Sequence, residues 1–181
     1  MKIYEAHGIT DFVICCGYRG YMIKEYFANY VLHSSDVTID ARSGEITYHS
    51  SGAEPWRVTL VDTGAETLTG GRLKRVRSYL GERFCMTYGD GLSDIDIRAQ
   101  IDFHMKHGRA ATIAAVMPPG RYGALDMTSD GVVRCFNEKP LGDEGCINGG
   151  FFVLENKVLD RIEADSTSFE GPPLEALAQE G

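Results

Sequence analysis

Short apolar runs alternate with amphipathic stretches along most of the chain. The runs at 12–16 (FVICC) and 83–88 (RFCMTY) are largely apolar, which is typical of strands buried on both faces of a sheet. Residues 20–31 repeat apolar pairs at the spacing of an amphipathic helix, and residues 97–107 show a similar pattern. Strands that alternate with helices predict an α/β fold with a Rossmann-like sheet, mixed but mostly parallel, and flanking helices.

Two pairs of segments predict antiparallel strands instead. Residues 36–50 alternate with a period of two around a Ser-Gly turn, and residues 121–127 and 132–139 flank a Ser-Asp-Gly turn. Near the end of the chain, residues 147–155 predict a strand and residues 157–165 predict a helix. No repeat, low-complexity segment or linker interrupts the pattern, so the sequence predicts a single domain.

Composition and charge exclude several classes of protein. The net charge is −8 and the sequence pI is about 5.1, whereas a nucleic-acid-binding domain usually presents a basic surface. No apolar stretch approaches the roughly 20 residues of a membrane span, and the first residues do not resemble a signal peptide. A small phosphorylated ligand stays possible, because it needs only a local basic pocket.

The cysteine and histidine residues predict no metal centre. The five cysteines are odd in number and lack CxxC spacing, so they are expected to be reduced thiols of a cytoplasmic protein. His104 and His107 share a helical face without a third ligand and are expected to be solvated. Four of the cysteines lie in apolar runs and are expected in the core: Cys15, Cys16, Cys85 and Cys135.

The segment TYGDG at 87–91 places an aspartate between two glycines at the end of a predicted strand. Ligands of open α/β sheets bind beyond the carboxyl ends of the strands. Gly89 and Gly91 would allow a sharp turn and a close approach to a ligand, and the Asp90 carboxylate suits Mg²⁺. The alternative is a turn aspartate that caps the next helix.

Asp94 and Asp96 form a DxD pair, a pattern that many glycosyltransferases use to bind a metal ion. The position of Asp94 just before an apolar repeat favours an N-cap instead. Asp96 is then expected in the first helical turn, where the helix dipole favours a negative charge.

The segment TGGR at 69–72 opens a helix with several cationic side chains. Backbone N–H groups at the start of a helix can bind an anion or a base edge. Arg72 lies nearest to the helix start and could point at a ligand, whereas Lys74, Arg75 and Arg77 are expected to form a solvated face. This motif is neither a Walker loop nor a Rossmann fingerprint, so it indicates little alone.

A third candidate site combines NEKP at 137–140 with NGG at 148–150. Lys139 could neutralise a phosphate as a point charge, and Asn148 offers an amide to sugar hydroxyls. Each segment taken singly is also compatible with an ordinary strand end.

Together these segments resemble a known family. The motifs VTLVDTG, LTGGRLKRV, TYGDG, PPGRYGALD, EKP and INGGFFV follow FVICCGYRGYMIKEYF in this order. Over residues 1–181 the sequence is similar to the glucose-1-phosphate cytidylyltransferases, a branch of the sugar-nucleotide pyrophosphorylases. The resemblance implies a nucleotide-diphospho-sugar transferase fold and an Mg²⁺-assisted reaction of CTP with glucose 1-phosphate that gives CDP-glucose and pyrophosphate.

The resemblance also implies roles for individual residues. Asp90 would be the metal ligand and, with Lys139, a catalytic residue. The residues implied for the nucleotide are Thr67, Gly70, Gly71, Arg72 and Gly89, and those implied for the sugar phosphate are Tyr122, Gly123, Glu138, Lys139 and Asn148. The implied partners are the two substrates and, in the complete enzyme, further copies of the chain, with no nucleic acid or membrane.

Two segments of that family have no match in the 181 residues: an N-terminal GGxGTR loop and a second metal-binding aspartate near the C-terminus. Residues 1–181 are therefore expected to form an incomplete nucleotidyltransferase domain, whose activity alone is an open question. Two alternatives stay open, a glycosyltransferase of related fold that uses Asp94 and Asp96, and a non-catalytic nucleotide-binding or assembly module.

Overall fold

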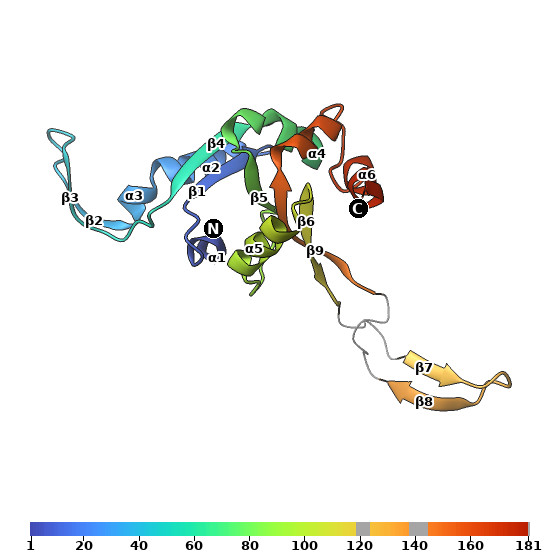
Figure 1. The fold of residues 1–181 in the computed structure, drawn as a ribbon. Coiled ribbons are helices and arrows are strands. Elements are labelled where there is room, and N and C mark those ends of the chain that lie inside the picture. The colour runs from blue at the N-terminus through green and yellow to red at the C-terminus, as the bar shows by residue number, and fades with distance from the viewer. Residues whose placement is uncertain (119–123, 138–144, 181) are drawn as a thin grey trace.

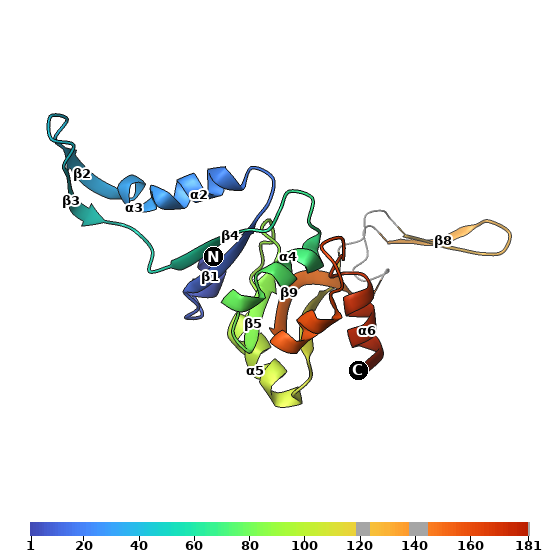
Figure 2. The same ribbon diagram turned by 90° about the horizontal axis from the view of Figure 1, so that it is seen from above.

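The structure of the chain is a computed structural model that describes residues 1–118, 124–137 and 145–180. A two-stranded and a three-stranded sheet with their helices make up the body of the molecule, and two hairpins project from it (Figures 1 and 2). The termini lie on the body, the N-terminus beside β1 (Asp11–Cys16) and the C-terminus in α6 (Pro172–Glu180).

The first sheet pairs β1 with β4 (Arg57–Asp62) in parallel, from Asp11 opposite Arg57 to Cys16 opposite Asp62. The short helix α1 (Lys2–Glu5) precedes β1, and α2 (Gly20–Ala28) and α3 (Tyr30–His33) follow it. The expected burial of β1 on both faces is wrong: only Cys16 is buried, and the residues before it are partly or fully exposed.

The second sheet has the order β5-β9-β6, formed by β5 (Arg83–Thr87), β9 (Ile147–Glu155) and β6 (Ala111–Val116). Helix α5 (Ile97–His107) joins β5 to β6, which run in the same direction, and β9 lies antiparallel between them. The expected mostly parallel sheet is therefore wrong, since β1–β4 is the one parallel ladder among the described strands.

The core forms around β9. Phe152 and Leu154 pack with Leu73 of α4 (Thr69–Arg75) and with the segment that follows β9, while Phe151 packs against Ile97. Two 3₁₀ helices complete this body, η1 (Arg77–Tyr79) and η2 (Asn156–Arg161). The helix expected at 157–165 is thus a shorter 3₁₀ turn.

Both expected hairpins are confirmed. They are formed by β2 (Ser35–Ile39) with β3 (Ile46–Ser51), and by β7 (Ala124–Met127) with β8 (Val133–Asn137). Every residue of β3 is exposed. Cys135 on β8 is exposed as well, so its expected place in the core is wrong. Among the described residues, no helix combines the length and the apolarity needed to cross a membrane.

The expected solvation of the α5 histidines is wrong too. His104 is only 1% exposed; its Nδ1 lies 2.8 Å from the Thr112 hydroxyl and its Nε2 lies 3.1 Å from Glu155 Oε1. His107 Nε2 lies 2.7 Å from the same hydroxyl. These polar contacts attach α5 to β6 and β9, and buried polar groups need such partners.

Candidate functional site

The predicted site residues that follow β5 and those in β9 lie at one end of the three-stranded sheet. Because the two strands are antiparallel, Thr87 at the end of β5 pairs with Phe151 in the middle of β9, and residues 147–150 of β9 extend beyond the end of β5. The Thr87 hydroxyl donates a hydrogen bond of 2.9 Å to the Gly150 carbonyl. We call this end, where β5 stops and β9 starts, the site end; at the far end β5 starts and β9 stops.

Asp90 lies in the turn that follows β5 at the site end. Its side chain is exposed and makes no hydrogen bond or ion pair with any described residue. Gly89 and Gly91 do not have positive φ, so the turn does not require glycine, contrary to expectation. A methyl group added at Gly89 would meet nothing within 4 Å, which leaves open space beside the carboxylate.

The expected roles of both DxD aspartates are wrong, since the helix begins at Ile97 and Asp94 lies ahead of its N-cap. Asp96 is the N-cap of α5: its Oδ1 accepts a hydrogen bond of 2.9 Å from the Ala99 amide and lies 3.6 Å from His7 Nδ1. Asp94 is exposed and has no partner among the described residues. The capping bond also shows that Asp90 does not cap this helix. No cluster of three or more His, Cys, Asp or Glu suited to a metal occurs in the described parts of the chain.

Arg72 reaches from α4 to the carboxyl ends of β1 and β4. Its Nη1 donates to the Thr63 hydroxyl at 2.7 Å, and its Nη2 donates to the Ala65 carbonyl at 3.1 Å. Thr63 is buried and donates in turn to the Cys16 carbonyl at 2.9 Å. A Cβ on Gly17 would lie 2.4 Å from Nη1, so the glycine makes room for the guanidinium.

A pocket of about 280 Å³ opens at the same ends of β1 and β4. Cys16, Gly17, Gly20 and Asp62 contribute to its lining. Open α/β sheets bind ligands at this place, beyond the carboxyl ends of parallel strands. Gly17 therefore lies between the Arg72 guanidinium and this pocket.

The glycines of TGGR serve packing in this structure. A Cβ on Gly70 would lie 2.7 Å from the Thr167 carbonyl oxygen, and one on Gly71 would lie 2.5 Å from Asp165 Cα. The Leu68 amide donates to the Asp165 carbonyl at 2.8 Å, and the Gly71 amide donates to the Thr167 carbonyl at 3.2 Å. The amides at this helix start are thus partly used within the chain. Thr67, also predicted to bind the nucleotide, is buried.

A polar network at the site end was not found from the sequence. The Tyr88 hydroxyl donates to Glu170 Oε1 at 2.7 Å and accepts from Asn148 Nδ2 at 3.3 Å. Glu170 Oε2 accepts from the hydroxyls of Thr69 at 2.5 Å and Ser168 at 2.6 Å. The network joins the start of α4, the turn after β5 and the start of β9, which the sequence had marked as separate candidate sites.

The electrostatics of this network favour a charged glutamate and a neutral tyrosine. Burial, together with the hydrogen bond to Glu170, raises the pKa of Tyr88 to about 12. Burial acts to raise the pKa of Glu170 as well, but hydrogen bonds from Ser168, Thr69 and Tyr88 outweigh it and hold this pKa below its usual range. Glu170 is therefore a carboxylate at neutral pH, and it can only accept hydrogen bonds.

Four predicted residues fall outside the described parts of the chain: Tyr122, Gly123, Glu138 and Lys139. Among the described candidates, the structure brings Gly89, Asp90 and Asn148 together at the site end. Arg72 and the TGGR glycines lie on α4, whose first residue, Thr69, is joined to Tyr88 through Glu170.

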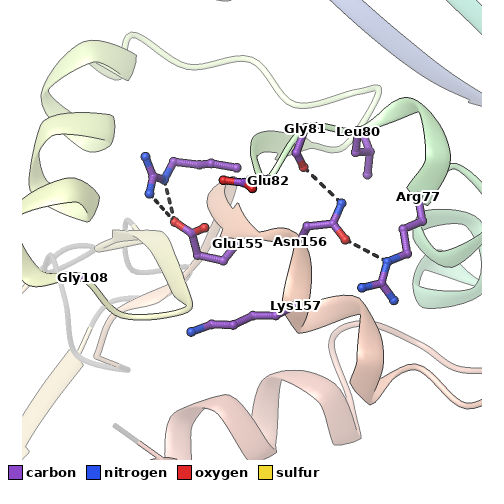
Figure 3. Close-up of a pocket in the computed structure, with 9 residues that line it drawn as sticks. Arg77, Leu80, Gly81, Glu82, Gly108, Glu155, Asn156 and Lys157 are labelled. Carbon is purple, nitrogen blue, oxygen red and sulfur yellow. Dashed lines mark hydrogen bonds and ion pairs between the residues drawn. The ribbon is translucent and has the colours of Figure 1, made fainter.

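A second pocket, of about 620 Å³, opens at the far end of the sheet (Figure 3). Asn156 lies across it, accepting from Arg77 Nε at 2.8 Å and donating to the Gly81 carbonyl at 3.1 Å. Arg83, at the start of β5, forms an ion pair of 2.5 Å with Glu155. None of the residues predicted to bind a substrate or a metal ion is among those that line this pocket.

Comparison with known proteins identifies the family. The profile of the nucleotidyl transferase family matches residues 6–175. The chain belongs to this family. It is 58% identical over its whole length to the glucose-1-phosphate cytidylyltransferase of Salmonella typhimurium, of which it covers 71%. It is 41% identical, with the same coverage, to a Bacillus subtilis protein named as a probable glucose-1-phosphate cytidylyltransferase.

Solved structures confirm the fold of this nucleotidyl transferase. HddC from Yersinia pseudotuberculosis aligns with a TM-score of 0.61 at 22% identity, over 94% of this chain and 67% of HddC. A UDP-glucose pyrophosphorylase complexed with UDP-glucose aligns with a TM-score of 0.56 at 13% identity, over 99% of this chain and 74% of that one. The predicted nucleotide-sugar transferase fold is confirmed, apart from the strand directions corrected above.

Proposed function

We propose that this nucleotidyl transferase joins CTP and glucose 1-phosphate to give CDP-glucose and pyrophosphate. The observation that carries the proposal is the identity of 58%, across the whole chain, to a glucose-1-phosphate cytidylyltransferase. The placement of Asp90 and Asn148 at one end of a sheet supports it, because ligands of α/β folds bind at such places.

Arg72 is proposed to contact the nucleotide. The guanidinium carries five N–H groups, and its bonds to Thr63 and Ala65 fix its plane while leaving other N–H groups for an acceptor on CTP. The neighbouring pocket at the ends of β1 and β4 gives such an acceptor room to approach. Gly70, Gly71 and Thr67 would act by placing Arg72 rather than by contacting CTP, since all three are buried.

Asp90 is proposed to hold Mg²⁺. Mg²⁺ prefers oxygen ligands and usually takes one or two protein carboxylates, with substrate phosphates and water completing its shell. A single exposed carboxylate without a partner among the described residues fits this demand. When bound, the ion would offset negative charge on the triphosphate.

The chain's own residues would act by positioning and by charge. Asn148 would hold a sugar hydroxyl at the site end, and Lys139 would neutralise the sugar phosphate. Tyr122, Gly123 and Glu138 are proposed for the same substrate on the ground of the resemblance. Fixing the two substrates for attack of the sugar phosphate on the α-phosphorus can lower the barrier without a covalent intermediate on the protein.

The test is turnover by the purified protein with CTP, glucose 1-phosphate and Mg²⁺, followed by chromatography of CDP-glucose and a coupled pyrophosphate assay. UTP and dTTP serve as matched controls, and we expect CTP to be preferred, because a site that hydrogen-bonds the cytosine amino group leaves polar groups unpaired with uracil. Equal use of CTP and UTP would contradict the proposed base. Binding of CTP without any product would instead support a non-catalytic module.

A further inference from the structure

We propose that Glu170 is a positioning residue that orients the Asn148 amide through the Tyr88 hydroxyl and so sets the affinity for the sugar phosphate. The inference rests on the proposed function, in which Asn148 contacts the sugar. Neither Glu170 nor Tyr88 belongs to the residues that the sequence motifs assign to either substrate.

The Glu170 carboxylate gathers three hydroxyl donors from three segments. Tyr88 follows β5 and precedes the Gly-Asp-Gly turn, Thr69 is the first residue of α4, and Ser168 lies just before Glu170 in the chain. The donor distances are 2.5–2.7 Å, which is typical of charge-assisted O–H···O⁻ bonds. A carboxylate so held has a fixed position relative to the site end of the sheet.

The charge of Glu170 determines the direction of the hydrogen bonds that connect Glu170, Tyr88 and Asn148. The carboxylate can only accept hydrogen bonds, so the Tyr88 hydroxyl donates its hydrogen to Glu170 Oε1. The Tyr88 hydroxyl oxygen can then accept a hydrogen bond from another donor. The donor that it faces is Asn148 Nδ2 at 3.3 Å. The Asn148 Oδ1 is then turned to the Gly150 amide, which donates to it at 2.7 Å.

The amide of Asn148 is therefore oriented from both sides. The second hydrogen of Nδ2 has no acceptor among the described residues, and Asn148 is exposed at the start of β9. A donor of known direction on an exposed strand end suits an acceptor oxygen of a sugar hydroxyl. Holding such a group in place before binding removes part of the ordering cost of the complex.

Tyr88 keeps its position without its hydroxyl. Its ring meets Phe152 edge-on, with ring centroids 6.0 Å apart. A Cβ on Gly150, which has φ of 79°, would lie 2.9 Å from Tyr88 Cδ2, so the ring also lies directly on the β9 backbone. Tyr88→Phe thus deletes the hydrogen-bond relay and leaves the ring packing.

The experiment compares Tyr88→Phe, Glu170→Gln and the double variant in steady-state kinetics. We expect each single variant to raise the KM for glucose 1-phosphate about fivefold to tenfold, with the KM for CTP changed less than twofold. The double variant should match the single variants, because both changes interrupt one relay. Tyr79→Phe is the matched control: it removes the hydroxyl of an exposed tyrosine that has no hydroxyl partner among the described residues, and it should leave both KM values unchanged within twofold.

Three results would overturn the inference: an unchanged KM for glucose 1-phosphate in Tyr88→Phe, an equal rise in both KM values, or additive effects in the double variant. Lack of CDP-glucose formation by the unsubstituted protein would overturn the proposed function itself. In that case the side-chain amide resonances of Asn148 still test the relay by NMR, since Tyr88→Phe should shift them and Tyr79→Phe should not. Unshifted resonances in Tyr88→Phe would refute the orienting role.

Discussion

Both ends of the β5–β9–β6 sheet carry polar groups, but their hydrogen-bond partners differ. At the far end, Arg83 and the buried His104 both contact Glu155. At the site end, Asp90 has no described partner and Asn148 keeps a donor hydrogen free of described acceptors. Polar groups satisfied within the chain stabilise the fold, whereas ordered groups left without a partner are available to a ligand.

The largest expected effect is a loss of activity without a loss of stability when Asp90, at the site end, is substituted. Asp90→Asn should lower kcat/KM at least about 100-fold, because loss of a metal-binding charge is worth several kcal/mol of transition-state stabilisation. The melting temperature should stay within about 1 °C, since surface changes without partners alter stability little. Kinetics and thermal melts of the same preparation check both statements.

Asp94→Asn is the control for that substitution. Asp94 is exposed and free of described partners, as Asp90 is, but it lies farther from the end of β5. We expect normal turnover from this variant. A large loss in Asp94→Asn with normal turnover in Asp90→Asn would favour the DxD alternative instead.

A second prediction concerns two glycines that the sequence placed in the same pocket. Gly71→Ala should lower the free energy of unfolding by about 1–3 kcal/mol, because its Cβ would lie 2.5 Å from Asp165 Cα and force the backbone apart. Gly89→Ala should leave stability unchanged, because its Cβ would meet nothing within 4 Å. Urea denaturation of the two variants measures the difference.

The kinetics of Gly89→Ala test whether a substrate binds beside Asp90. If a substrate approaches the backbone beside Asp90, the added methyl group should raise the KM for a substrate even though the fold is intact. Unchanged kinetic constants in this variant would mean that no substrate approaches the backbone at Gly89.

A third prediction concerns the far end. Glu155→Ala should destabilise the protein by about 1–3 kcal/mol, because it leaves Arg83 and the buried His104 without their acceptor. Both KM values should be unchanged, since this end lies opposite the site. Glu82→Ala is the exposed control at the same end of the sheet, and equal destabilisation by both substitutions would contradict the structural role of Glu155.

Most elements of the fold were predictable because local pattern determines them. The apolar runs of β5 and β9, the amphipathic α5 and both hairpins were found from periodicity and turn residues. The direction of β9 was not, because an apolar run does not encode which way a strand pairs. The sequence predicted the N-cap of α5 two residues too early, at Asp94 in place of Asp96. Both positions are aspartates, so only the backbone conformation shows which of them caps the helix.

The candidate site was predictable where a short motif carries it and not where the chain must fold to assemble it. Asp90 and Asn148 lie in motifs rich in glycine. Glu170 lies in an ordinary loop, and its partners Tyr88 and Thr69 are 82 and 101 residues away in the sequence. The burial of Gly71 likewise depends on a segment that no sequence pattern places against α4.

The smallest expected effect is a pH dependence at the far end. Burial acts to raise the pKa of Glu155, but hydrogen bonds from His104 and Arg83 outweigh it and lower this pKa below its usual value. A carboxylate with a lowered pKa contributes stability that is present above the unfolded pKa, about 4.3, and that is lost as the pH falls through the lower folded value. Wild-type stability should therefore fall more steeply than that of Glu155→Gln below about pH 4.3, because the glutamine has no proton to take up. Urea denaturation at several pH values between about 6 and 3 checks this, and parallel stability curves for the two proteins would show that the far end does not depend on the charge of Glu155.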